Sequence, residues 1–397
     1  MTNLETVDLT NKYLASTYRR YPISIAKGKG PRVWDADGNE YLDFVSGLAV
    51  CNLGHCHPKV TGAIKKQAEA LIHVSNLYNI QPQAELASLL VENSFADKVF
   101  FCNSGAEANE AAIKLARRFS RDNFGRDRYE IIAMKNSFHG RTMATITATG
   151  QEKFSAGFEP LLPGFSHVDF NDIAALDEAV NEKTCAVMVE PIQGEGGVIV
   201  PSDGYLKAVR QICAQKDLLL IFDEVQVGMG RTGKLFAYEN YGVEPDIMTL
   251  AKGLAGGVPI GAMAAKKDVM DSFSPGAHAS TFGGNPLSTA AGVAAVKAIL
   301  YDGVMENCLS MGKLLVDKLE GFKNKYSFIR DVRGKGLIYG MELEYGCSAV
   351  VEEAMRKGLL INCTSDGILR FLPPLIISES DIEEMAGILD KILAELK

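Results

Sequence analysis

Two charged residues each follow an apolar run of the kind that forms a buried strand. Asp223 ends the run LLLIF at 218–222, and Lys252 follows the run IMTLA and precedes a glycine-rich loop. A buried carboxylate without a partner is costly, so Asp223 must lie at the exposed carboxyl end of its strand or face a cation. Lysine is likewise rarely buried unless it is paired. Both residues therefore indicate a site at the carboxyl ends of strands, where open α/β sheets bind ligands.

The two residue types fit the chemistry of an aldehyde cofactor that contains a pyridine ring. A carboxylate at 223 would pair with the protonated ring nitrogen and keep the ring an electron sink for a carbanion. Desolvation and cationic neighbours would lower the pKa of Lys252 and free its nitrogen to form an imine. Each residue alone also has an ordinary interpretation: an acidic strand end or helix cap for Asp223, and a salt-bridged lysine for Lys252.

A third candidate site begins where the run KVFFC ends in Asn103-Ser104-Gly105 and a helical stretch follows. Free N–H groups and the dipole at a helix start favour an anion such as phosphate. Ser104 adds a hydroxyl donor, and Gly105 lets the backbone come close. An ordinary N-cap by Ser104, with Glu107 completing a capping box, is compatible with the same residues.

The elements that position these residues are indicated by short apolar runs that alternate with helical stretches over 98–264. This alternation predicts an α/β domain with a largely parallel sheet, and the continuous runs suit strands covered on both faces. Asp37-Gly38 predicts a hairpin turn near the N-terminus. Later runs and a closing helix from Ser380 predict a smaller α+β domain. We expect an N-terminal segment over 1–50 that packs with the small domain, a large domain over 51–290 and a small domain over 291–397.

The composition is that of an ordinary globular protein with an acidic balance. The 397 residues include 41 Lys and Arg against 49 Asp and Glu, a net charge of -8. This balance argues against nucleic acid or an anionic membrane as a partner, and it leaves any anionic substrate to a few local arginines. The eight cysteines include no C-x-x-C, so we expect free cysteines in a reducing cytoplasm. We expect no signal peptide and no membrane span.

Two further motifs suggest other functions. The segment GMGRTG over 228–233 satisfies G-x-G-x-x-G and nearly forms a P-loop, but Leu235 replaces the magnesium-binding hydroxyl and no long helical pattern follows. The segment HCHP over 55–58, with Cys51 nearby, contains metal-ligand types, but adjacent ligands cannot easily converge on one tetrahedral ion. We therefore expect neither a nucleotide site nor a metal site.

In this order the motifs resemble those of the class III aminotransferases. The resemblance rests on NSGAEANEAAIKLAR, SFHGRT, EPIQGEGG, DEVQVGMGRTG, TLAKGLAGGVPIGA and STFGGNPL, and it extends nearly from end to end. It implies an α/β protein of the pyridoxal-phosphate-dependent transferase fold type I, similar to aspartate aminotransferase. Such a protein has a large domain with a mostly parallel sheet and a smaller α+β domain. The implied cofactor is pyridoxal 5'-phosphate.

The resemblance implies roles for the cofactor site. Lys252 matches the lysine that carries the cofactor as a Schiff base, and Asp223 matches the partner of the pyridine nitrogen. Gly105 and Ala106, beside Ser104, match the turn that binds the cofactor phosphate, and Thr281 matches a phosphate ligand from the partner subunit. Gln226 matches the hydrogen-bond partner of the phenolic oxygen, and Phe138 matches the aromatic side chain that stacks on the ring. Many relatives have threonine at the position of Ala106. A shared site implies an obligate homodimer.

Substrate-binding residues follow from the same resemblance. Arg141, with Ser280 beside it, matches the arginine for the substrate carboxylate, and Arg370 matches the arginine for the α-carboxylate of glutamate. Glu195 matches the glutamate that neutralises Arg370 when no α-carboxylate is present. A bidentate contact would contribute about 1.5–3 kcal/mol, whereas a surface ion pair, the alternative for either arginine, contributes little. We expect His139 to be a supporting hydrogen-bonding residue.

Within the family, FVSGLAVCNLGHCHPKV and HVSNLYNIQPQAELASLL resemble members that act on N2-acetyl-L-ornithine in arginine biosynthesis. The implied ping-pong reaction with 2-oxoglutarate gives N-acetyl-L-glutamate 5-semialdehyde and L-glutamate, with Lys252 moving the proton. Alternative donors are succinylornithine and succinyl-diaminopimelate, then ornithine and 4-aminobutyrate. A non-catalytic sensor or scaffold with this fold is the alternative from another class, and the presence of Lys252, Asp223 and both arginines argues against it.

Overall fold

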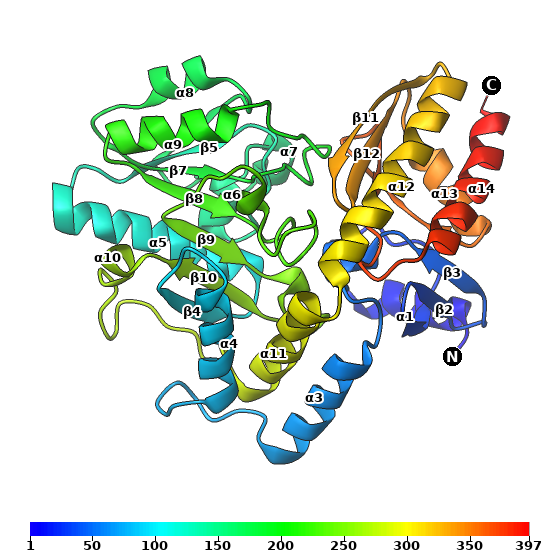
Figure 1. Ribbon diagram of the computed structural model, residues 1–397, viewed down its shortest axis with the longest axis horizontal. Helices are drawn as coiled ribbons and strands as arrows, with labels where there is room; N and C mark the ends of the chain where they lie inside the picture. Colours follow the sequence, from blue (N-terminus) through cyan, green and yellow to red (C-terminus); the bar gives the residue numbers. More distant parts are fainter. Residues whose placement is uncertain (397) are drawn as a thin grey trace.

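A seven-stranded sheet forms the centre of the large lobe, which comprises strands β4–β10 and helices α3–α11 (Figure 1). The computed structural model describes residues 1–396. The strand order is β4-β10-β9-β8-β7-β5-β6; β10 is antiparallel to both neighbours, and the pairs from β9 to β6 are parallel. The strands are β4 (Lys98–Cys102), β5 (Glu130–Met134), β6 (Phe165–Val168), β7 (Thr184–Val189), β8 (Leu219–Asp223), β9 (Ile247–Leu250) and β10 (Gly261–Ala265).

Helices cover both faces of this sheet, so β7 and β8 are buried along their whole length, and their sequences are apolar apart from Thr184 and Asp223 at their ends. Successive side chains point to opposite faces: Ile131 packs in one cluster with Leu115 of α5, and Ile132 in another with Val209 of α9. The helices are α3 (Pro58–Ala70), α4 (Gln81–Glu92), α5 (Gly105–Phe124), α6 (Met143–Ala148), α7 (Glu152–Ser155), α8 (Ile173–Ala179), α9 (Tyr205–Gln215), α10 (Lys267–Met270) and α11 (Pro286–Tyr301), with short 3-10 turns at Ala237–Asn240 and Lys252–Ala255.

The N-terminal segment forms a second sheet with a strand from near the other end of the chain. It contains α1 (Asn3–Tyr13), β1 (Ile25–Lys29), β2 (Arg32–Asp35), β3 (Glu40–Asp43) and the short turn α2 (Ser46–Ala49). The hairpin expected around Asp37-Gly38 joins β2 to β3. Strand β13 (Leu359–Leu360) then adds to β3 in parallel, which places 25–43 beside 359–360.

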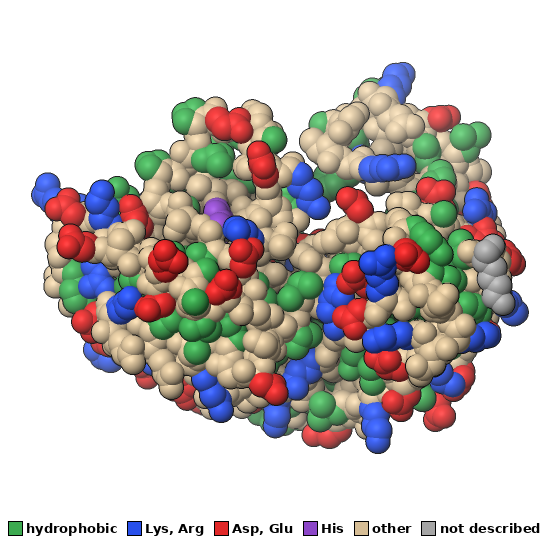
Figure 2. Space-filling view, turned by 90° about the horizontal axis from the view of Figure 1, so that it is seen from above, with side chains coloured by type: hydrophobic (Ala, Val, Ile, Leu, Met, Phe, Trp, Pro, Cys, Tyr) green, Lys and Arg blue, Asp and Glu red, His purple; other side chains and the backbone are tan. Residues whose placement is uncertain are grey.

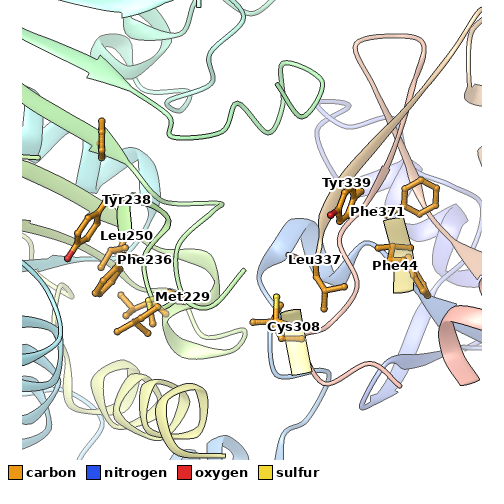
Figure 3. Close-up of a cluster of buried hydrophobic side chains, with 14 of the residues drawn as sticks. Phe44, Met229, Phe236, Tyr238, Leu250, Cys308, Leu337, Tyr339 and Phe371 are labelled. Atoms are coloured by element: carbon orange, nitrogen blue, oxygen red, sulfur yellow. The ribbon is translucent and has the colours of Figure 1, made fainter. Parts of the chain in front are cut away.

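The small lobe comprises β11–β15 with helices α12–α14. Its four-stranded sheet has the order β11-β12-β15-β14. The elements are α12 (Val304–Lys325), β11 (Ile329–Lys335), β12 (Ile338–Leu343), α13 (Ser348–Arg356), β14 (Asn362–Thr364), β15 (Ile368–Phe371) and α14 (Glu379–Glu395). One hydrophobic cluster runs through both lobes: Figure 3 shows Met229 and Phe236 on one side, Leu337 and Phe371 on the other, and Cys308 between them. The boundaries given for the three sequence regions stay a prediction.

Two cysteines of the small lobe form a disulfide, which we did not expect from the sequence. Cys347, at the start of α13, forms a disulfide with Cys363 of β14, with Cα atoms 5.8 Å apart. The expectation of free cysteines is wrong for this pair, because their proximity arises from tertiary packing across 16 residues and no local motif announces it. The six other cysteines are free. Among the described residues, no single helix is long and apolar enough to cross a membrane; only α11 and α12 together, bent by 64°, reach that length.

Candidate active site

A cavity of about 480 Å³ lies where β8 and β9 end and α5 begins. Nine of the twelve predicted site residues line it: Ser104, Gly105, Ala106, Phe138, Arg141, Glu195, Asp223, Gln226 and Lys252. Arg370 does not line the cavity but hydrogen-bonds two of its lining residues, Glu195 and Gln226. Seen from above, the surface of the molecule is hollowed between the two lobes, and acidic and basic side chains are interspersed over this face (Figure 2).

Lys252 follows β9 with a left-handed backbone, at φ 45°. Non-glycine residues rarely adopt this conformation, and it persists only where the surroundings impose it. Burial lowers the pKa of the Lys252 ammonium; nearby Arg370 lowers it further, while Glu195 and Asp223 oppose the shift. The lysine nitrogen is therefore more readily neutral than in water, which is the form that attacks a carbonyl carbon.

Asp223 ends β8 and is 4% exposed. Its Oδ2 accepts a hydrogen bond from Asn109 Nδ2 at 2.7 Å and lies 2.8 Å from His139 Nδ1, while its Oδ1 accepts from the N–H of Val225. Thr249 in turn donates to Asn109 Oδ1 at 2.7 Å. His139 thus lies where we expected a supporting hydrogen-bonding residue. The cost of burying the carboxylate is offset by these donors, and its orientation is fixed.

Sequence reasoning missed Asn109 and Thr249. Asn109 lies one helical turn after Gly105 and so faces the same side of α5, which is a signal that could have found it. Glu190, in EPIQ, was also missed: its carboxylate accepts from the backbone N–H groups of Phe138 and Gly194. Burial raises the pKa of Glu190 to about 7, although His139 opposes the shift.

The start of α5 offers unpaired backbone donors to the cavity. Ser104 is the N-cap, and its Oγ accepts from Glu107 N at 3.2 Å. The carboxylate of Glu107 accepts from Asn103 N at 2.6 Å, one residue before the position that a capping box would use. The N–H groups of Gly105 and Ala106 have no acceptor within the helix. A Cβ at Gly105 would lie 2.7 Å from Val225, so glycine permits this close packing.

The buried Arg370 forms an ion pair with Glu195, which is partly exposed on the cavity wall. Arg370 is 0% exposed, and its Nη1 lies 2.7 Å from Glu195 Oε1. Burial alone would raise the pKa of Glu195, but Arg370, Lys252 and the hydrogen bond from Gln226 lower it to about 2. Arg370 Nη2 is buried and has no hydrogen-bond partner among residues 1–396. A carboxylate that entered the cavity could accept from this free donor.

Arg141 differs from Arg370 in lacking an acidic partner. Its guanidinium lies 4.0 Å from the ring centre of Phe154 and 5.7 Å from that of Phe138. No salt bridge within the described part of the chain involves it. Stacked on an aromatic ring and free of competing carboxylates, Arg141 can bind an anionic substrate at the cavity wall.

Ser280 and Thr281 do not line this cavity within one chain. Ser280 Oγ accepts from Asn103 Nδ2 at 3.0 Å and from Gly283 N at 3.1 Å. Its expected place beside Arg141 in the substrate site stays a prediction. Thr281 lines a separate hollow with Lys114 and is exposed. Its expected contact from a partner subunit stays a prediction.

The chain is similar in sequence to known proteins over nearly its whole length. Residues 13–393 match the family model described as Aminotransferase class-III. The chain is 57% identical over 387 residues to acetylornithine aminotransferase of Caldanaerobacter subterraneus subsp. tengcongensis, covering 97% of this chain and 98% of the relative. It is 54% identical to acetylornithine aminotransferase of Methanocaldococcus jannaschii, covering 98% of each.

Solved structures are similar over the whole length. Ornithine aminotransferase from Toxoplasma gondii ME49 has a TM-score of 0.96 at 36% identity, covering 100% of this chain and 96% of that one. Acetylornithine aminotransferase from Elizabethkingia anophelis has a TM-score of 0.90 at 34% identity, covering 100% of both.

Proposed function

Because the chain belongs to the class-III aminotransferases, we propose that it transfers the δ-amino group of N2-acetyl-L-ornithine to 2-oxoglutarate. The products are N-acetyl-L-glutamate 5-semialdehyde and L-glutamate, formed in arginine biosynthesis. Relatives at 54–57% identity carry the name of this donor, and they match the chain over nearly its whole length. The expected fold type I and the dependence on pyridoxal 5'-phosphate are confirmed by the family.

The residues of the cavity fit pyridoxal phosphate. Lys252 supplies an amine with a lowered pKa, Asp223 a carboxylate at the position for a ring nitrogen, and Gly105 with Ala106 the free N–H groups for a phosphate. Phe138 lies on the cavity wall as a ring for stacking. When bound, the cofactor supplies an electron sink for negative charge on the substrate carbon.

Lys252 has two tasks in this proposal. Its Nζ would hold the cofactor, and the δ-amine of the donor would replace Nζ there. Once free, Nζ would accept a proton from the δ-carbon of the donor and deliver it to the cofactor carbon, and its lowered pKa favours the neutral form that accepts a proton. Asn109, His139 and the N–H of Val225 fix the orientation of the Asp223 carboxylate, which would pair with the ring nitrogen of the cofactor.

The Arg370–Glu195 pair supports the proposal that one site accepts two different substrates in turn. With Glu195 on Arg370, the site beside Lys252 accepts the δ-amine of a donor whose α-carboxylate binds Arg141 instead. When 2-oxoglutarate enters, its α-carboxylate takes the place of Glu195 and uses the free Nη2 of Arg370. Arg141 then binds the second carboxylate of 2-oxoglutarate.

A second copy of the chain completes the proposed site. Thr281 is exposed beside Phe282, which is 60% exposed, and a homodimer would cover this apolar side chain and bring the hydroxyl to the neighbouring cofactor phosphate. A fully active monomer in sedimentation would refute this part. We place the enzyme in the cytoplasm because six of its eight cysteines are free, although reducing conditions disfavour the Cys347–Cys363 disulfide.

The substrate is tested with a panel of amino donors at fixed 2-oxoglutarate, ranked by kcat/KM. The panel contains acetylornithine, succinylornithine, succinyl-diaminopimelate, ornithine and 4-aminobutyrate. We expect acetylornithine to rank first, because relatives at 54–57% identity carry the name of this donor. Equal values for 4-aminobutyrate and acetylornithine would overturn the proposal.

A further inference from the structure

Arg231, in the segment GMGRTG, is a fully buried cation without a carboxylate partner. Its side chain is 0% exposed; Nη1 donates to Leu337 O at 2.9 Å and to Pro373 O at 2.5 Å, and Nη2 donates to Asn52 Oδ1 at 2.5 Å. No acidic side chain of residues 1–396 forms a salt bridge with it, and burial lowers its pKa to about 10. A buried charge is costly, so an arginine at this position needs an explanation beyond packing.

The three acceptors of Arg231 come from separate parts of the fold. Asn52 lies in the connection between α2 and α3, Leu337 joins β11 to β12, and Pro373 follows β15. The N–H of Leu337 also donates back to Arg231 O at 3.0 Å. In Figure 3, Met229 of the same segment and Leu337 face each other across the junction of the lobes. Arg231 therefore connects its own segment of the large lobe to the small lobe and to the connection between α2 and α3.

Asn52 carries this connection to the backbone at Lys252. It is 1% exposed, and its Nδ2 donates to Met229 O at 2.8 Å. A Cβ at Gly253 would lie 2.4 Å from Asn52 Nδ2 and 3.2 Å from the Cβ of Met229. Asn52 and Met229 thus pack directly against the residue after Lys252. Met229 and Lys252 both have left-handed backbones, at φ 54° and 45°, which packing must impose.

We propose that Arg231 is a positioning residue for Lys252, which it orients through Asn52. Arg231 fixes the amide of Asn52, and the amide fixes the left-handed backbone that directs Lys252 into the cavity. Because two of the acceptors of Arg231 belong to the small lobe, this orientation depends on the docking of the two lobes. Arginine suits the task because its planar group donates in several directions at once, which lysine cannot reproduce. The inference rests on the proposed role of Lys252 in cofactor attachment.

The test compares the holoenzyme forms of Arg231→Lys and Asn52→Ala with the parent. The first measurement is the pH midpoint of the visible absorption of the cofactor attached to Lys252. We expect the midpoint to rise by about one pH unit, because the imine nitrogen that joins Lys252 to the cofactor would lose part of the desolvation that disfavours its charged form. We also expect kcat to fall by about tenfold or more, because a misplaced catalytic group slows the reaction. The KM for acetylornithine should change little.

Arg128 offers a matched control. It also donates to three backbone carbonyls, of Thr184, Lys216 and Asp217, but at the opposite end of the sheet, before β5 and β8 begin. Arg128→Lys should lower the thermal midpoint of unfolding and leave the absorption midpoint at the parent value. If Arg231→Lys behaves in the same way, Arg231 is only a structural connection and the proposal is overturned.

A second pair of variants keeps the test decisive if Arg231→Lys does not fold. Gly253→Ala places a methyl group against Asn52, and Asn52→Ala removes that obstacle. The double variant should therefore show an absorption midpoint and kcat no worse than Asn52→Ala alone. Additive losses would contradict the proposed contact. A separate experiment tests the attachment of the cofactor. The parent is reduced with borohydride, and the mass of the peptide that contains Lys252 is measured. A peptide without bound cofactor would refute the proposed function itself.

Discussion

Replacing Glu195 by Gln is expected to change which carboxylates the site accepts. Burial opposes the shift, but Arg370 and Lys252 lower the pKa of Glu195 from its ordinary 4.5 to about 2, so Glu195 is ionised at neutral pH and pairs with Arg370. A charge-assisted contact of this kind contributes about 1.5–3 kcal/mol. An incoming α-carboxylate must displace this group from Arg370, and glutamine removes most of the competition while it keeps the shape of the side chain.

The expected result is a changed ratio of substrates. For Glu195→Gln, kcat/KM for L-glutamate relative to acetylornithine should rise at least tenfold, with roughly 150-fold as the upper limit that 3 kcal/mol allows. Single-turnover loss of the visible cofactor band measures each half-reaction separately. Glu344→Gln, which breaks an exposed pair with Arg330, serves as the control and should leave the ratio unchanged. An unchanged ratio in Glu195→Gln would refute the displacement of Glu195 by substrate.

Four further results are expected. Lys252→Ala should abolish the attached cofactor band and turnover; an intact band would contradict its assignment. Arg141→Ala should lower kcat/KM for acetylornithine about 30-fold, the loss of a contact of roughly 2 kcal/mol, and an unchanged value would remove it from the substrate site. Asp43 and then Cys51 raise the pKa of His55 from 6.5 to about 10. The charged His55 therefore stabilises the fold fully below pH 6.5, and this contribution is lost as the pH rises towards 10. In His55→Gln, the thermal midpoint of unfolding should fall less between pH 6.5 and 10 than in the parent, and an equal fall would contradict this role. Cys363→Ser should lower the stability of the non-reduced protein by about 3 kcal/mol in denaturant titration, and an unchanged value would show that the disulfide does not form.

The central residues of the cavity were predictable because their signals are local. Asp223 and Lys252 each interrupt the pattern of a buried strand, and Ser104-Gly105 stands at the start of a strong helical pattern. The parallel sheet brings these strand ends to one edge without further information. The assignments of Arg141, Arg370 and Glu195 came from the family resemblance, since neither the bend at Arg141 nor the short strand with Arg370 has a local pattern that separates a substrate ligand from an ion pair.

Features made by contacts between distant segments were not predictable. The glycines of GMGRTG suggested a phosphate loop, but a Cβ at Gly233 would lie 2.3 Å from Leu309 and one at Gly230 would lie 2.9 Å from Leu375. They permit close packing of the small lobe, which a nucleotide motif does not require. His55, in HCHP, hydrogen-bonds Asp43 at 2.7 Å, and no cluster of metal-ligand side chains occurs among residues 1–396.

The parallel pairing of β3 with β13 also sets an order of events during synthesis. Strand β3 leaves the ribosome more than 300 residues before Leu359 and Leu360, so one of its edges stays exposed for most of translation. Exposed strand edges promote aggregation of nascent chains. The short β3, with Asp43 at its end, limits that risk. The large lobe can begin to fold while the chain grows, but the sheet that joins both ends of the protein is completed only after nearly the whole chain has been made.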